Sequence, residues 1–254
     1  MDERAHGLIL RIRPLTDSSL IVHWLTREAG RLATVAQGAR RPRSPWAGRL
    51  DLFHLADLSF HRRRGELHRL GEVQVTGRFP RLAADFAALQ LAAYAVGAIE
   101  GVSETETPVP ELWELLREFL GYLEGHPASA RALFAFEVRL LASQGVEPRA
   151  DTGAPARAST RELLEQLQLA PWADLPRLTA APEAVHGLDA FLQRFLADHL
   201  GRLPRGRPAA WAALRDPAAR PAPIGPVTGI APAGSAAPQS TGPGPGAGAS
   251  AAGR

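Results

Sequence analysis

The chain of 254 residues contains no cysteine, and it has no run of about 18 apolar residues that could span a bilayer. The first absence excludes disulfide bonds, thiolate zinc sites and thiol catalysis, and it is compatible with a reducing compartment. The opening Met1-Asp2-Glu3-Arg4 leads into no apolar signal segment. We therefore expect a cytoplasmic protein with no membrane attachment.

Lysine is also absent, so all 29 basic residues are arginine. Abundant alanine, glycine and proline are typical of a GC-rich genome, which accounts for part of the arginine content. The distribution is more informative: residues 1–81 hold 15 arginines against 8 acidic residues, a net charge of +7, whereas residues 82–254 hold 14 against 18, a net charge of −4. We therefore expect the N-terminal third to contact a polyanion.

The residue patterns of common catalytic sites are missing as well. No Gly-x-Ser-x-Gly motif occurs, and segment 38–48 lacks the lysine and the final serine or threonine of a phosphate-binding loop. His54, His61 and His68 are spread over two expected strands without a neighbouring group of carboxylates, which favours surface or partly buried histidines over a metal site. We expect a protein that is not an enzyme and that uses no metal, cofactor or small-molecule substrate.

A cationic segment lies between Gly30 and Leu50. Alternating residues predict a strand from Arg31 to Gln37, and a loop follows from Gly38. Arginine forks bind phosphate oxygens and stack on bases, and an aromatic ring among them offers a platform for any base, so the segment suits single-stranded nucleic acid. A solvated loop kept out of a sheet by its prolines would have the same composition. The candidate DNA-binding residues are Arg31, Arg40, Arg41, Arg43, Trp46 and Arg49.

Five strands are expected within the first 80 residues. Apolar residues alternate in the first, and β-branched and aromatic residues mark the second. Short turns containing Gly30 and Gly65 connect later strands. This pattern is typical of a small antiparallel barrel of the OB type. The expected strands cover residues 8–13, 20–25, 31–37, 50–60 and 66–75.

Two aromatic residues and a basic triplet allow more than one interpretation. Trp24 is expected in the barrel core, whereas Trp46 could equally pack there or serve as the platform for a base. Arg62-Arg63-Arg64 lies at the tip of a hairpin. It is either a solubilising turn or an extension of the cationic surface.

From Arg81 onward, apolar residues recur with the period of a helix. We expect a first helix with Leu82, Phe86, Leu89, Ala93, Val96 and Ile99 on one face, and further helices near residues 108–125, 128–144, 160–169 and 185–200. From Pro217 the composition is almost only proline, alanine, glycine and serine, which predicts disorder. The expected organisation is an α+β chain with an OB-type DNA-binding domain (1–80), a helical domain (81–216) and a disordered tail (217–254).

Several segments together resemble the RecO family of bacterial recombination mediators. The resemblance covers about residues 4–210 in order. The segments are Gly7-Leu8-Ile9-Leu10, residues 24–32, residues 37–44, residues 136–141 with Gly145 and Pro148, and residues 195–202.

The resemblance implies binding of single- and double-stranded DNA, annealing of complementary strands, and loading of RecA together with RecR and the single-strand binding protein. It maps the phosphate-binding surface by motif onto Arg31 and the loop from Gly38 to Arg49. Many family members carry a four-cysteine zinc module after the position of Pro148, which this chain lacks. Residues 149–182 are therefore expected to depart from the family pattern.

The resulting prediction is a non-catalytic DNA repair and recombination mediator. Two alternatives stay open, namely an RNA-binding OB protein and an assembly scaffold whose barrel is only structural. A preference for DNA over RNA distinguishes the first two. The absence of salt-dependent binding to either nucleic acid would favour the scaffold.

Overall fold

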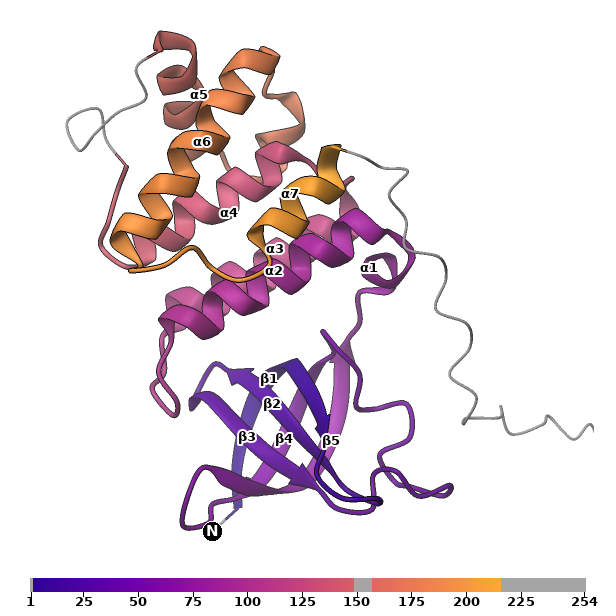
Figure 1. The fold of residues 1–254 in the computed structure, drawn as a ribbon. Helices are drawn as coiled ribbons and strands as arrows, with labels where there is room; N and C mark the ends of the chain where they lie inside the picture. Colours follow the sequence, from indigo (N-terminus) through magenta and orange to yellow (C-terminus); the bar gives the residue numbers. More distant parts are fainter. Residues whose placement is uncertain (1, 149–156, 216–254) are drawn as a thin grey trace, which may run out of the picture. The chain divides into compact units, whose positions relative to one another are not determined.

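The computed structural model describes residues 2–148 and 157–215. Its N-terminal part is a closed barrel with the strand order β1-β2-β3-β5-β4 (Figure 1). Neighbouring strands are antiparallel except β3 and β5, which are parallel. The five-stranded barrel followed by helices confirms the predicted OB-type α+β fold. The strands are β1 (Asp2–Pro14), β2 (Leu20–Thr26), β3 (Gly30–Ala36), β4 (Leu55–His61) and β5 (Leu67–Gly77).

Alternating residues of the strands fill the barrel interior. Trp24 is fully buried, and its Nε1 donates a hydrogen bond to Thr34 Oγ1 at 2.8 Å. A buried indole N–H without an acceptor would cost about 1–3 kcal/mol, so this bond stabilises the pairing of β2 with β3. The predicted core position of Trp24 is confirmed. The inward-facing residues include Ile9, Val22, Trp24, Leu32, Ala56, Phe60 and Val73.

The fourth strand is shorter than predicted. Residues 50–54 were expected to be extended, but they form a loop, and β4 begins at Leu55. Phe53 has a positive φ of 63°, and its ring packs with the core of the helices. The Phe53 N–H still donates to Ile9 O at 2.9 Å, so its backbone is paired without being part of a strand. The alternation of apolar residues that predicted a strand from residue 50 does not hold at Leu52, which is 45% exposed.

The rest of the described chain is mainly helical (Figure 1). The first predicted helix is divided at Asp85, whose side chain accepts a hydrogen bond from Ala88 N at 3.1 Å and caps the second piece. Residues 207–215 form a helix that was not predicted. The helices are α1 (Pro80–Ala84), α2 (Phe86–Val102), α3 (Pro110–Gly125), α4 (Ala130–Ser143), α5 (Ala158–Leu169), the 3-10 helix η1 (Trp172–Arg177), α6 (Pro182–His199) and α7 (Arg207–Arg215).

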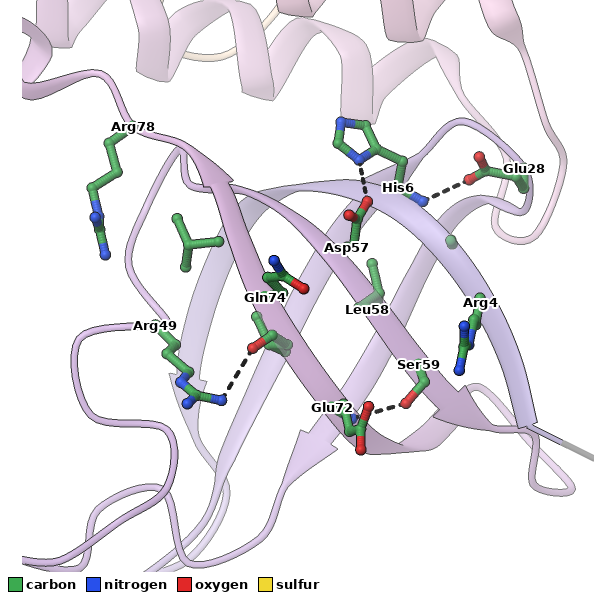
Figure 2. Close-up of a pocket in the computed structure, with 13 residues that line it drawn as sticks. Arg4, His6, Glu28, Arg49, Asp57, Leu58, Ser59, Glu72, Gln74 and Arg78 are labelled. Carbon is green, nitrogen blue, oxygen red and sulfur yellow. Dashed lines mark hydrogen bonds and ion pairs between the residues drawn. The ribbon is translucent and has the colours of Figure 1, made fainter.

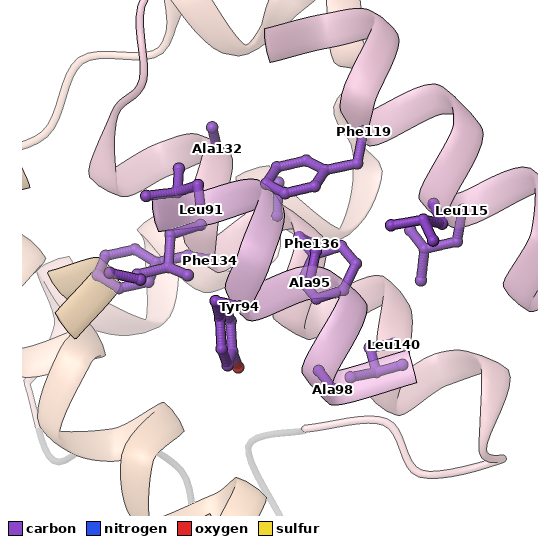
Figure 3. Close-up of a cluster of buried hydrophobic side chains, with 14 of the residues drawn as sticks. Leu91, Tyr94, Ala95, Ala98, Leu115, Phe119, Ala132, Phe134, Phe136 and Leu140 are labelled. Carbon is purple, nitrogen blue, oxygen red and sulfur yellow. The ribbon is translucent and has the colours of Figure 1, made fainter. Parts of the chain in front are cut away.

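The apolar face predicted for the first helix is confirmed at Leu82, Val96 and Ile99, which are buried, but it is wrong at Ala93. Ala93 is exposed, whereas Leu91 and Tyr94 are buried. Helix α2 contacts α1, α3, α4 and α7, so a single apolar stripe cannot describe it. Figure 3 shows its side chains beside Phe119 of α3 and Phe136 of α4, whose rings stack with centroids 4.7 Å apart.

A buried charge network joins α2, α4, α6 and α7. The Arg207 side chain, 2% exposed, donates from Nε to Oε1 of the fully buried Glu137 at 2.8 Å and from Nη1 to Asp189 at 2.7 Å. Tyr94 also donates to Glu137 Oε1, at 2.8 Å. Burial raises the pKa of Glu137, and the charge of Arg207 acts against this shift. The hydrogen bonds from Arg207 and Tyr94 replace those that the Glu137 carboxylate would form with water.

Residues 103–109, between α2 and α3, lie against the barrel, and we call this segment the clasp. Thr105 forms a parallel bridge with Arg31 of β3. A Cβ atom at Gly30 would lie 2.2 Å from Thr107 O, and Gly30 has a φ of 69°. Glycine is therefore required for both the turn and the close approach of the clasp.

The clasp is held by charged side chains as well as by its backbone. Glu106 has a φ of 57°, and its N–H donates to a carbonyl of β3 at 2.7 Å. Its carboxylate lies 2.6 Å from Nε2 of buried His68 and pairs with Arg62, which also pairs with Glu3 at 2.7 Å. His68 Nδ1 accepts from a backbone N–H, so we assign the proton to Nε2. Several contacts thus hold a backbone conformation that non-glycine residues rarely adopt.

The strands end at Gly77 and the helices begin at Pro80. The barrel and the helices belong to one compact unit. The predicted tail (217–254) and residues 149–156 lie outside the described residues. Within the described ranges, no helix is long and apolar enough to cross a bilayer.

Candidate nucleic-acid interface

The cationic loop comprises residues 37–54, between β3 and β4. It is a series of turns in which N–H groups bond to carbonyls three residues earlier. These bonds run from Arg41 to Gly38, from Ser44 to Arg41, and from Ala47 to Ser44, at 3.1, 3.1 and 3.2 Å. The backbone therefore has an ordered path without being part of the sheet.

The arginines of the cationic loop differ in what they contact. Arg40 is anchored to the turn between β1 and β2, because its N–H donates to Ser18 O at 3.0 Å and its Nη1 to Thr16 O at 3.1 Å. Arg41 and Arg43 are exposed, and among the described residues the side chain of neither forms a hydrogen bond or an ion pair. Their guanidinium donors are available to an external anion.

Arg49 and Arg31 each use part of the guanidinium group inside the protein. Arg49 Nη1 donates to Val73 O of β5 at 3.2 Å. The half-buried Arg31 donates from Nη2 to Ser103 O of the clasp at 3.0 Å. Its Nε is buried and has no partner within the described part of the chain. The structure therefore groups four of the predicted arginines on the cationic loop and binds Arg31 to the clasp.

Trp46 is held in place against the barrel. Its Nε1 donates to Gln37 O at 3.0 Å, and its backbone N–H donates to Ser44 Oγ at 3.2 Å. The partly buried side chain packs against the barrel core. The packing interpretation of this residue therefore applies to the buried part of its side chain, and the role as a base platform stays a prediction.

A groove with a volume of about 980 Å³ opens beside Arg49, on the outer face of β1, β4 and β5 (Figure 2). Among the predicted residues, only Arg49 lines it. The other lining residues come from distant parts of the chain and were not predicted. The only indication of Arg4 in the sequence is its outward position next to buried Ala5. Because arginines and carboxylates are equal in number, the groove itself does not favour a polyanion. The charged residues are Arg4, Arg49, Arg78, Glu28, Asp57 and Glu72.

The positive field extends over the barrel near β1 and β2. Partial burial lowers the pKa of His23, and the charges of Arg13, Arg11 and Arg31 lower it further, against an opposing effect of Glu100. These arginines add positive charge on this part of the barrel, although Arg11 pairs with Glu100.

The three histidines that were considered as metal ligands each bind a different partner. His68 bonds to Glu106, and His61 pairs with Asp2. His54 Nδ1 lies 3.2 Å from a backbone carbonyl of the cationic loop. Within the described ranges, no group of three or more histidine, aspartate or glutamate side chains could hold a metal ion.

Two family models match the chain. "Recombination protein O N terminal" matches residues 1–79, and "Recombination protein O C terminal" matches residues 83–155. Together the two matches cover more than half of the 254 residues. The junction between them falls where the barrel ends and the helices begin.

Curated relatives carry the same description, "DNA repair protein RecO". The relative from Syntrophus aciditrophicus is 36% identical over 149 residues, which cover 58% of this chain and 58% of the relative. Those from Anaeromyxobacter dehalogenans and Myxococcus xanthus are each 33% identical, over 157 and 154 residues, covering 61% and 59% of this chain and 62% and 63% of the relatives. The chain therefore spans less than two thirds of the length of these relatives.

Proposed function

Because the chain belongs to the RecO family of DNA repair proteins, we propose that it binds single- and double-stranded DNA through the cationic loop. The observation that carries this proposal is the state of Arg41 and Arg43, which are exposed and unpaired within the described part of the chain. In the proposal, these two residues with Arg40 and Arg49 contact phosphates. Arg31 contributes positive field from β3, where its side chain binds the clasp, and Trp46 contacts a base.

We further propose that the protein acts in the cytoplasm as a non-catalytic mediator. It anneals complementary strands and helps to load RecA onto DNA coated with the single-strand binding protein, with RecR as a partner. Annealing requires no active site, because arginines that neutralise the phosphates of two strands reduce their repulsion and raise their local concentration. The cationic loop supports this proposal, since it contains four arginines and only one carboxylate, Asp51.

The test compares two triple variants with the same change in net charge. One replaces Arg40, Arg41 and Arg43 with alanine, and the other replaces the exposed Arg117, Arg177 and Arg194 of the helices. The log-log salt dependence of single-strand binding has a slope of about −0.7 per neutralised phosphate, so the first variant should lose roughly 2 units of slope. The second should keep the wild-type slope.

The same assay decides between the proposal and its alternatives. A preference for RNA over DNA of equal length would indicate an RNA-binding protein. Binding that does not depend on salt, or a wild-type slope in the folded loop variant, would contradict phosphate contact by the cationic loop. Annealing is measured with complementary oligonucleotides, bare and coated with the single-strand binding protein, and RecR binding is measured separately.

A further inference from the structure

A second hollow lies between the cationic loop and the barrel, with a volume of about 520 Å³. Gln37, Pro45 and Trp46 line it from the loop, and Arg69 and Gly71 of β5 line it from the barrel. It is large enough for a planar heterocycle.

Gly71 and Ser59 line this hollow where β4 and β5 approach closely. A Cβ atom at Gly71 would lie 2.7 Å from Ser59 Oγ, and the pairing of β4 with β5 is irregular between Ser59 and Phe60. Any side chain at Gly71 would therefore displace Ser59 from this wall of the hollow. On the opposite wall, the hydrogen bond from Trp46 Nε1 to Gln37 O fixes the position of the indole ring before any ligand arrives.

The charges that line the hollow oppose one another. Arg4 and Arg69 are accompanied by Asp2 and Glu72. A phosphate would meet two carboxylates here, whereas the exposed Arg41 on the adjoining loop has no charged partner among the described residues. A neutral, planar group with hydrogen-bonding edges suits the hollow better than an anion does.

We propose that the hollow accepts an unpaired nucleobase, which stacks on Trp46 while its backbone phosphates lie on the arginines of the cationic loop. This inference rests on the proposed DNA binding and adds the class of ligand group that the site selects. Bases in a duplex are paired and stacked on their neighbours, so they cannot enter. The hollow therefore makes the protein prefer single strands, whereas the loop arginines bind both forms.

The experiment uses the full chain and two oligonucleotides with the same number of phosphates, one of thymidines and one of abasic residues. Stacking of one base on an aromatic ring corresponds to a roughly 5- to 150-fold gain in affinity. Wild-type protein should bind the abasic strand more weakly by a factor in this range. The salt slopes for the two strands should be equal, since the phosphate contacts are the same.

Two substitutions at one position connect this difference to the indole ring. Trp46→Leu and Trp46→Phe both lose the hydrogen bond to Gln37, but only phenylalanine retains an aromatic face. The leucine variant should bind both strands equally, and the phenylalanine variant should keep a preference for the thymidine strand. Circular dichroism confirms that the variants are folded.

Equal wild-type binding to the thymidine and abasic strands, with a normal salt slope, would overturn the base pocket while leaving the phosphate-binding loop intact. Absence of salt-dependent binding to either strand would instead contradict the proposed function itself. Because the comparison of strands uses wild-type protein, it remains decisive even if the leucine variant does not fold.

Discussion

Arginines serve different purposes in the two halves of the molecule. In the helices, Arg207 is buried against Glu137, and Arg139 packs its guanidinium 4.2 Å from the ring of Trp172 while donating to Ala170 O at 2.5 Å. In the cationic loop, Arg43 is exposed and contacts no acceptor among the described residues. The same side chain is therefore structural in one region and available in the other.

This difference shows that arginine content alone does not identify a binding surface. The helical half carries a net negative charge in the sequence, yet Arg207 and Arg139 are needed there to bind a buried carboxylate and a helix-end carbonyl. The barrel half carries a net positive charge, and Arg41 and Arg43 have no acidic partner among the described residues. The relevant quantity is the number of guanidinium groups left without a protein partner.

The largest effect is expected from breaking the buried network. Replacing Glu137 with alanine leaves Arg207 as a buried charge with only Asp189 to balance it, which typically costs about 3–5 kcal/mol of unfolding free energy. Equilibrium denaturation with urea measures this loss. The control is Asp174→Ala, which removes an exposed ion pair to Arg177 and should cost less than about 1 kcal/mol. Equal losses in the two variants would contradict the comparison.

A smaller loss is expected at the turn beneath the clasp. In Gly30→Ala the new methyl group meets Thr107 O, and alanine must also adopt a positive φ. Strained positions of this kind cost about 1–3 kcal/mol. Gly48→Ala is the matched control, since its φ is 69° and its Cβ meets open space. The difference in unfolding free energy between the two variants isolates the contact with the clasp. A negligible difference would show that the clasp moves away from the new methyl group at little cost.

The ion pairs of the clasp predict a dependence on pH. Partial burial tends to raise the pKa of Glu106, but hydrogen bonds from His68 and Arg62 outweigh this and lower it below the ordinary value of 4.5. A lowered pKa means that the stabilisation is fully present above the ordinary value and is lost as pH falls through the lowered one.

Glu106→Gln should therefore reduce the stability at pH 7 by about 1 kcal/mol. The reduction should shrink in acid, where the wild-type carboxylate is itself protonated. Thermal unfolding of both proteins between pH 7 and 3 measures the effect. A difference that stays constant down to pH 3 would mean that the charge of Glu106 contributes nothing.

The smallest change in stability is expected in the cationic loop. Replacing Arg40, Arg41 and Arg43 removes only the hydrogen bond from Arg40 to Thr16, so the unfolding free energy should change by no more than about 0.5 kcal/mol. The same variant should lose much of its DNA affinity. A large loss of stability would show that these arginines hold the loop together, and it would weaken the contrast with the helices.

Features governed by nearby residues were predictable from the sequence. Gly30 was expected in a turn between strands, and it has a positive φ of 69°. Trp24 was expected in the core of the barrel, within a strand marked by β-branched and aromatic residues. Strand and helix types followed from periodicity, which local geometry alone imposes.

Features that depend on distant residues were not predictable in the same way. The bond between Arg207 and Glu137 joins positions 70 apart in the sequence, and that between His68 and Glu106 joins positions 38 apart. Phe53 left the expected strand because its ring packs with the helical core, which no local pattern reveals. The arginines of the candidate site were found by composition, whereas their availability became apparent only from the contacts of each side chain.

The clasp determines where this chain can be cut into fragments that keep their contacts. Its residues come after the first long helix in the chain, yet they complete the β3 edge where β5 does not reach. A fragment ending near residue 80 would contain all five strands and still expose the Arg31 carbonyl that Glu106 normally binds. The barrel and the helices are therefore not interchangeable modules, and a chimera should exchange residues 1–109 as one piece.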